Sequence, residues 1–518
     1  MPASPSTARA INDRLALRLL QQEGPLTAGQ LKQLTGLSRP TVADLVERLT
    51  AAGLIGVVGE AGEQRRGPNA KLYGIVADRA HLAALDIRTE GVSVVVSDLV
   101  GAVLAEASVP IGGDTGTGPA VEQAVALVER VVKEAGADRL HTVGIGAPGL
   151  IDPVSGELRD STGLPEWHRR LVAALQERFP EARVNVENET NLAALAEQRD
   201  GVAQDRDTFV LLWLGHGTGA AVVLDGALRR GASGGTGEIG FLPVPGTSGL
   251  PSAVDCEGGF HSLAGSAAVV ELAASYGLSI EDVTVHEPLA AGVVRGAVAL
   301  VAGGGAAGAG DRRVVRGGAT HASGGSGRDE ATGVSGGTGR VEGDRASSVA
   351  SPASSADERA AVTRTIAGMD GGTGAPGPSD SSVRAERHST TEPPAALAEP
   401  SRVHDTAPVD RPHSAASADQ PHHTVPADRF LDALADRLAI GVASVVAILD
   451  PGCVVLGGEV GQAGGDVLAR RVEERIRRMS PLVTVVRSSG LGGGAVLRGA
   501  LLTARDAAQD ELFAPPDR

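Results

Sequence analysis

Basic side chains near the N-terminus are the residues of this chain whose chemistry is easiest to read. Arg65 and Arg66 lie in a polar loop between two apolar stretches, 54–58 and 71–75, that predict a β-hairpin. Guanidinium groups at the tip of a hairpin could reach DNA phosphates or a minor groove. Residues 1–80 carry ten Lys or Arg against seven Asp or Glu, whereas the whole chain has a net charge of −16. This contrast between a slightly basic head and a strongly acidic body predicts two separate functions on one chain.

A helix-turn-helix is expected just before that hairpin. Thr27 and Gln30 form a capping box, which predicts the start of one helix. We expect this helix to bury Leu31 and Leu34. Ser38 is a good N-cap for a second helix. The spacing of four apolar residues gives the second helix one inward face: Val42, Leu45, Val46 and Leu49.

The residues predicted to contact double-stranded DNA are polar side chains on the outer face of the second helix and on the hairpin. They are Ser38, Arg39, Thr41, Arg48, Arg65, Arg66 and Lys71. The alternative is a small helical domain for protein contacts, with solvated charges. The order of cap, turn, helix and basic hairpin favours a winged helix-turn-helix DNA-binding domain at 1–80.

The rest of the chain divides by composition. Residues 82–101 and 209–226 each contain an apolar strand, a glycine-containing turn and a second Val-rich strand, which predicts a duplicated α/β domain with a cleft between two lobes. Residues 303–424 contain no aromatic residue, one Leu and one Ile. Such a segment buries too little apolar surface to offset its ordering entropy, so it is predicted to be a disordered insertion. The folded body is therefore expected at 81–302 and 425–518.

Several classes of protein are disfavoured by the sequence. No apolar run approaches the ~18 residues that a membrane span needs, and the N-terminal segment has no apolar signal core. Two cysteines, Cys256 and Cys453, cannot form a disulfide framework or a thiolate zinc site unaided. We therefore expect a cytoplasmic protein with no membrane partner, no metal and no cofactor.

Six motifs of the body occur in the order seen in one known family. They are GIGAPGLID (144–152), TGLPEWH (162–168), VNVENETNLAALAE (184–197), WLGHGTGAAVVLDG (213–226), GGTGEIGFLPV (234–244) and ILDPGCVVLGGEV (448–460). Together with the winged head, the chain resembles a transcriptional regulator of the ROK family, which also contains sugar kinases. The resemblance implies an α/β fold in which the winged helix-turn-helix is joined to a two-lobed actin-like ATPase domain. It further implies a sugar cleft between the lobes and a homodimer or homotetramer.

Two departures from the kinases of this family bear on catalysis. Their D-x-G-G-T phosphate turn is replaced by a run in which Arg88 takes the place of the first glycine and Glu90 adds negative charge. The aspartate that serves them as general base matches Glu189, whose extra methylene moves the carboxylate by roughly 1 Å. We therefore expect no catalytic residue, with Glu189 as a degenerate base, and no kinase activity.

The resemblance implies sugar-binding roles for Asn188, Glu189, Glu238 and His261. The alternative is that each carboxylate caps a helix or accepts backbone N–H groups, and that the histidine is structural or solvated. Family members usually carry Asn where Gly163 stands and a zinc-linked His where Phe241 stands. The cysteine-rich zinc loop of the family is reduced here to DCEGGFHSLAG, which argues against structural zinc.

Three functions are compatible with these observations. The favoured one is a sequence-specific DNA-binding transcriptional regulator, a repressor that senses a sugar or sugar derivative in its kinase-like body. The second is a bifunctional regulator that still phosphorylates a sugar. The third is a constitutive DNA-binding regulator whose sensor domain is vestigial, which the losses at Gly163, Phe241 and His261 would support.

Overall fold

The fold is that of a computed structural model, which describes residues 5–61, 69–159, 164–247, 249–278, 287–309 and 421–514. Arg65, Arg66 and Gly163, as well as most of the predicted insertion 303–424, lie outside the described residues. The helix before the predicted insertion and the helix after it each extend a few residues into the range 303–424. The division of the chain at residues 80, 302 and 424 remains a prediction.

The N-terminal head is a winged helix-turn-helix. Its elements are α1 (Pro5–Glu23), β1 (Leu26–Thr27), α2 (Ala28–Thr35), α3 (Arg39–Ala51), β2 (Ile55–Ala61) and β3 (Ala70–Ile75). The three strands form an antiparallel sheet in the order β1-β3-β2, in which β2 and β3 make the expected hairpin.

The predicted capping box at the start of α2 is confirmed. The backbone N–H of Thr27 donates to Gln30 Oε1 at 2.9 Å, and the N–H of Gln30 donates to Thr27 Oγ1 at 3.2 Å. Ser38 caps α3 by accepting from the N–H of Thr41 at 3.3 Å. The four apolar residues predicted for the inward face of α3 are all buried.

One burial prediction in the head is wrong. Leu31 is buried, but Leu34 remains 49% exposed. Helix α2 has only eight residues, and Leu34 lies in its last turn, just before the left-handed Gly36 that ends the helix. Leu31 is the one residue of this short helix that the core buries.

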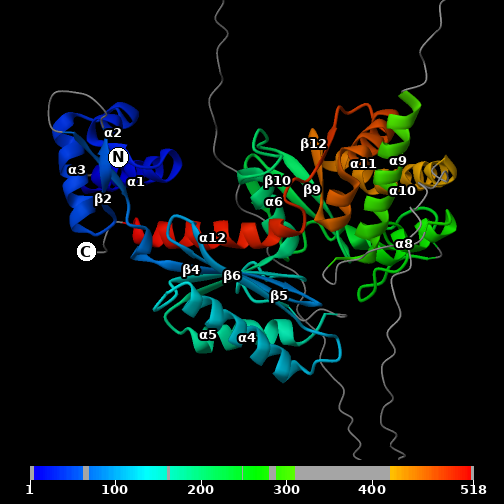
Figure 1. Ribbon diagram of the computed structural model, residues 1–518, viewed down its shortest axis with the longest axis horizontal. Coiled ribbons are helices and arrows are strands. Elements are labelled where there is room, and N and C mark those ends of the chain that lie inside the picture. The colour runs from blue at the N-terminus through cyan, green and yellow to red at the C-terminus, as the bar shows by residue number, and fades with distance from the viewer. Residues whose placement is uncertain are drawn as a thin grey trace, which may run out of the picture. The chain divides into compact units, whose positions relative to one another are not determined.

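The first lobe of the body is a five-stranded sheet in the order β6-β5-β4-β7-β8. Its elements are η1 (Ala77–Arg79), β4 (His81–Arg88), β5 (Gly91–Asp98), β6 (Val103–Pro110), α4 (Thr117–Glu134), β7 (Thr142–Ala147), α5 (Trp167–Arg178) and β8 (Arg183–Asn188). Strands β4, β5 and β6 pair antiparallel, whereas β4, β7 and β8 pair parallel. Helices α4 and α5 cover one face of this sheet, and α12 lies on the other (Figure 1).

The second lobe repeats this strand arrangement, in the order β11-β10-β9-β12-β13, which confirms the predicted duplication. Its strands are β9 (Phe209–Leu214), β10 (Thr218–Leu224), β11 (Ala227–Arg229), β12 (Cys453–Gly457) and β13 (Val485–Ser488). Its helices are α6 (Glu189–Arg199), η2 (Ile239–Phe241), α7 (His261–Ala264), α8 (Ser266–Ser275), α9 (Leu289–Ala309), α10 (Pro421–Leu449), α11 (Gly458–Met479), η3 (Gly492–Gly494) and α12 (Ala495–Leu512). Within the described ranges, no helix combines the length and the apolar character needed to cross a bilayer.

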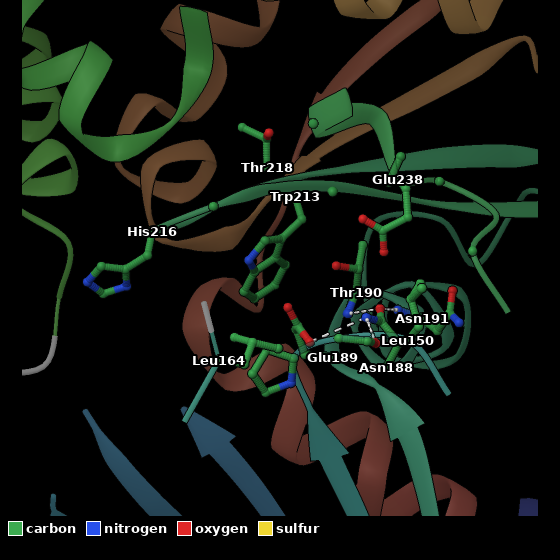
Figure 2. Close-up of a pocket in the computed structure, with 18 of the residues that line it drawn as sticks. Leu150, Leu164, Asn188, Glu189, Thr190, Asn191, Trp213, His216, Thr218 and Glu238 are labelled. Atoms are coloured by element: carbon green, nitrogen blue, oxygen red, sulfur yellow. Dashed lines mark hydrogen bonds between the residues drawn. The ribbon is translucent and has the colours of Figure 1, made fainter. Parts of the chain in front are cut away.

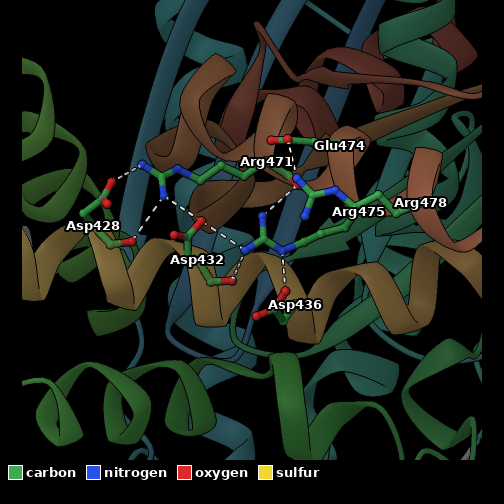
Figure 3. A network of polar contacts seen from close by, with 7 residues as sticks. All are labelled: Asp428, Asp432, Asp436, Arg471, Glu474, Arg475 and Arg478. Atoms are coloured by element: carbon green, nitrogen blue, oxygen red, sulfur yellow. Dashed lines mark hydrogen bonds and ion pairs between the residues drawn. The ribbon is translucent and has the colours of Figure 1, made fainter.

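Helix α10 is held on α11 by a ladder of ion pairs (Figure 3). Asp432 lies at 2.8 Å from Arg471 Nη1 and at 3.0 Å from Arg475 Nη2. Asp428 and Asp436 extend the ladder by one helical turn on either side, through Arg471 and Arg475 respectively. The side chains of the two arginines are only 17% and 14% exposed, so the ladder lies at the helix interface.

Helices α6 and α12 pack between the two sheets. Leu192 of α6 and Val496 and Ala500 of α12 share one buried cluster with Phe209 of β9. The helices approach each other closely at Gly499, where an added Cβ would lie 2.1 Å from the carbonyl oxygen of Leu192. Only glycine fits there.

The C-terminal half of α12 leaves the body core and enters the core of the head. Ala504, Ala508 and Phe513 share a buried cluster with Leu17 and Leu20 of α1. The side-chain amide of Gln509 donates to Gln21 Oε1 at 2.9 Å and to the carbonyl oxygen of Leu99 at 3.0 Å. The sequence did not reveal this shared core, because α12 carries no motif of its own.

We expect Gly499→Ala to lower the free energy of unfolding by about 1 to 3 kcal/mol, because the methyl group forces α6 and α12 apart. This loss outweighs the gain of up to ~1 kcal/mol that alanine brings to a helix. The matched control is Gly494→Ala, where an added Cβ meets nothing within 4 Å. Urea denaturation followed by circular dichroism measures both variants. Equal stability of the two would mean that the helices are not in the close contact described.

Candidate functional site

A cavity of about 870 Å³, lined by both polar and apolar side chains, lies between the two lobes. Its wall is made by the end of β4, the start of α6, the turn between β9 and β10, the loop before η2, and α7. All four residues predicted to bind a ligand line it: Asn188, Glu189, Glu238 and His261. Figure 2 shows the carboxyl groups of Glu189 and Glu238 inside this cavity.

Asn188 is the N-cap of α6. Its Oδ1 accepts from the backbone N–H groups of Thr190 at 2.9 Å and Asn191 at 3.3 Å, and its Nδ2 donates to the carbonyl oxygen of Gly149 at 3.0 Å. The helix cap therefore fixes the orientation of this amide. Its role in ligand binding remains a prediction, with much of its hydrogen-bonding capacity already used within the protein.

Glu187, which directly precedes Asn188, stabilises the start of α6 through its own polar contacts. It is buried and forms an ion pair with Arg230 Nε at 2.6 Å. It also accepts from the side-chain amide of Asn191 at 2.9 Å. These contacts tie the start of α6 to the loop that follows β11.

Glu189 is the first residue of α6, and its environment keeps it protonated near neutral pH. Burial raises the pKa of its carboxyl group to about 8, and the nearby Asp86 and Glu238 add to this shift, while Arg88 opposes it. Loss of solvent also raises the pKa of Glu238. A protonated Glu189 donates a hydrogen bond and is a poor proton acceptor, which differs from what a general base requires.

Arg88 fills the end of β4 and joins the two lobes. Its Nε donates to Asp86 Oδ2 at 2.9 Å, Nη1 pairs with Glu459 of α11, and Nη2 donates to the carbonyl oxygen of Gly493 at 2.7 Å. Burial opposes the charge of this guanidinium, but Asp86 and Glu459 outweigh that effect and raise the pKa of Arg88. A half-buried cation with two carboxylate partners thus lies at the end of β4, beside the turn that glycines would leave open.

Asp86 is 4% exposed, and burial raises the pKa of its carboxyl group in spite of Arg88. Its second oxygen, Oδ1, is buried without a hydrogen-bond partner. The hydroxyl of Thr218, on the opposite lobe, is buried and unpartnered as well. Both residues line the cavity. Sequence reasoning gave neither residue a role. Their side-chain oxygens can be recognised as unpartnered only once the fold has formed the cavity.

His261 and His216 bring imidazoles to the same cavity. Burial lowers the pKa of His261, so it is neutral near pH 7. His216, in the glycine turn between β9 and β10, lies 3.2 Å from a carboxylate oxygen of Glu90. Phe241, which stands where the family has a zinc-linked His, lines the cavity and is 39% exposed.

The predicted DNA-binding residues that the structure describes lie on the head, away from the elements that line the cavity. Ser38, Arg39 and Lys71 are exposed, and Thr41 is half-buried on the outer side of α3. Arg48 instead pairs with Asp13 of α1 at 2.5 Å. This ion pair gives Arg48 a structural task within the head, and its contact with DNA remains a prediction.

Two repeated sheets around a cleft, with a winged helix-turn-helix packed on the last helix, define a regulator-type relative of the two-lobed sugar kinases. The chain belongs to the ROK family, whose model matches residues 82–285 and 416–507. A model of the MarR family matches residues 11–67, which cover the helix-turn-helix.

Named relatives are consistent with this assignment. The xylose repressor of Caldicellulosiruptor bescii is 27% identical over 46% of this chain and 59% of its own length. The DNA-binding transcriptional dual regulator NagC of Escherichia coli is 28% identical over 46% of this chain and 58% of its own length. The matched part thus spans about three fifths of each relative. A crystal structure of a ROK family transcriptional regulator, a homologue of E. coli Mlc, has the same fold, with a TM-score of 0.58, 18% identity and 98% coverage of both chains.

The raised pKa of Glu189 predicts a pH dependence of stability. Between the ordinary value of 4.5 and the folded value of about 8, the folded protein holds a proton that the unfolded chain releases. Its contribution to stability therefore falls as pH rises through this window. We expect Glu189→Gln to gain stability relative to the unsubstituted protein between about pH 5 and pH 8, measured by urea denaturation. Glu177→Gln, at an exposed position on α5, is the control; parallel curves for all three proteins would contradict the assignment.

Proposed function

We propose that this protein is a sequence-specific DNA-binding transcriptional regulator, a repressor, that senses a sugar or sugar derivative in the cavity of its ROK body. The observation that carries the proposal is the path of α12. Val496, near its N-terminus, lines the cavity, and Ala504 and Ala508, further along, are buried in the core of the head. A ligand that changes how the lobes close on the cavity therefore acts on a helix that also supports the DNA-binding domain.

Two relatives support the proposal through their names, which describe a xylose repressor and a DNA-binding transcriptional regulator. Each is similar to this chain over 46% of this chain's length. The partners proposed for this chain are a double-stranded DNA operator and a small sugar effector. We further propose that it binds the operator as a homodimer or homotetramer, which would present paired heads to two half-sites.

Arg39 opens the recognition helix and is exposed, so we expect Arg39→Ala to weaken operator binding by about 1 to 3 kcal/mol without unfolding the head. The DNA is a duplex selected from a random pool by the unsubstituted protein, and binding is followed by fluorescence anisotropy. Arg170→Ala is the matched control, because Arg170 is an exposed arginine of α5. A sugar that binds the cavity should release the same DNA.

Unchanged affinity of both Arg39→Ala and Lys71→Ala would remove this face of the head as the DNA reader. If DNA binds normally but no sugar of a broad panel changes its affinity or stabilises the protein, the constitutive regulator with a vestigial sensor replaces the proposal.

We propose, in addition, that the body does not phosphorylate its ligand. The guanidinium of Arg88, balanced by Asp86 and Glu459, fills the turn where a kinase would leave backbone N–H groups open to a phosphate. Glu189 holds its own proton near neutral pH and is a poor base. The bifunctional regulator is the alternative.

We expect no sugar-dependent ADP release from the unsubstituted protein in a coupled assay with hexoses and amino sugars. Glu189→Asp should not create this activity, because the nucleotide would still meet Arg88 and Glu90. Turnover in either protein would establish the bifunctional alternative. A ROK sugar kinase assayed in parallel confirms that the coupled assay detects turnover.

A further inference from the structure

Acidic side chains outnumber basic ones around the cavity. Five carboxyl groups line it, those of Asp86, Glu90, Glu189, Glu238 and Glu459. Among the described lining residues there is one Lys or Arg, and this is Arg88. The cavity is thus an acidic site, with carboxyl groups contributed by both lobes.

The basic groups of the cavity are not free to bind an anion. Arg88 is balanced by two carboxylates, Asp86 and Glu459, and also donates to the carbonyl oxygen of Gly493. His216 lies against Glu90, and His261 is neutral because burial lowers its pKa. A phosphate or carboxylate on the ligand would therefore meet acidic groups with little compensation.

Two of the acidic groups, those of Glu189 and Glu238, lack cationic partners. Within the described part of the chain, neither Glu189 nor Glu238 forms an ion pair, and the polar contact of Glu189 with a neighbouring side chain is Asn188 Nδ2 at 3.4 Å. Asp86 Oδ1 is an independent indication of a missing partner, because this atom is buried, accepts no hydrogen bond and belongs to a residue that lines the cavity. A buried acceptor without a partner favours a ligand that supplies a donor to it.

These three carboxyl groups belong to one local cluster. Asp86 and Glu238 lie near enough to Glu189 to disfavour its ionisation. Trp213, only 7% exposed, adds a flat apolar surface to the same wall (Figure 2). An ammonium group supplies three donors and a positive charge to such a cluster, and the aromatic ring suits the apolar face of a pyranose.

We propose that the effector is an unphosphorylated amino sugar with a free, protonated amino group, which lies among Glu189, Glu238 and Asp86. This inference rests on the proposed sensing function and narrows its ligand class. Acetylation of the amine would remove the charge that the cluster favours. A phosphate ester would add charge that no free cation of the described cavity balances.

Titration calorimetry at about pH 6.5 tests the proposal with matched sets in the gluco, galacto and manno series. Each set contains the free amine, its N-acetyl derivative, the neutral hexose and the 6-phosphate of the amine. We expect one free amine to bind about tenfold or more tightly than the other three members of its set. An N-acetyl sugar, hexose or phosphate ester that binds as tightly as its free amine overturns the proposal.

Two variants identify the responsible groups. Glu189→Gln and Glu238→Gln keep the shape of each side chain but cannot carry the negative charge that a carboxyl group gains when it gives up its proton beside a bound ammonium group. Each should therefore reduce the preference for the amine over the N-acetyl sugar by about tenfold. Glu177→Gln, exposed on α5, should keep the full preference. A preference that survives in both cavity variants contradicts the placement of the amine.

Release of selected DNA separates this inference from the proposed function. If a neutral or phosphorylated sugar releases the DNA and the free amine does not, the regulator is a sugar sensor and the amino-sugar inference alone fails. If no member of any set binds the protein or releases DNA, the sensing function fails together with it.

Discussion

Close packing of α12 is the constraint on which the arrangement of the described head and body depends. The helix lies between two sheets in its first half and inside the head core in its second half. Small residues make this possible: Ala495, Gly499, Ala500, Ala504 and Ala508 are all buried along its length. Side chains of ordinary size would hold the helix away from α6 and from the head, and tightly packed interiors do not absorb such volume.

The contact of Arg88 with Asp86 and Glu459 is the second element that joins the lobes. A buried charge pair adds little net stability relative to apolar residues, but removal of one partner leaves an uncompensated charge at a cost of about 3 to 5 kcal/mol. Arg88 and its two carboxylate partners therefore depend on one another.

The local features of the fold were predictable from the sequence, whereas the contacts that give the cavity its character were not. The capping box of Thr27 and Gln30 involves residues three positions apart, and helix periodicity predicted the buried face of α3. By contrast, Arg88 and Glu459 are 371 positions apart, and no spacing rule connects them. Family resemblance predicted that Asn188, Glu189, Glu238 and His261 share one cavity. The missing partner of Asp86 and the ion pair of Arg48 within the head could be seen only in the folded structure.

The ion-pair ladder between α10 and α11 has a consequence for the evolution of the gene. Helices α9 and α10 pack on each other and on α11, so both borders of the intervening segment are held by the body itself. The entropic cost of closing a loop between two fixed points grows only with the logarithm of its length. DNA encoding extra residues can therefore enter or leave between these helices with little selective penalty. The same position offers a permissive place to graft a foreign domain or to open new termini.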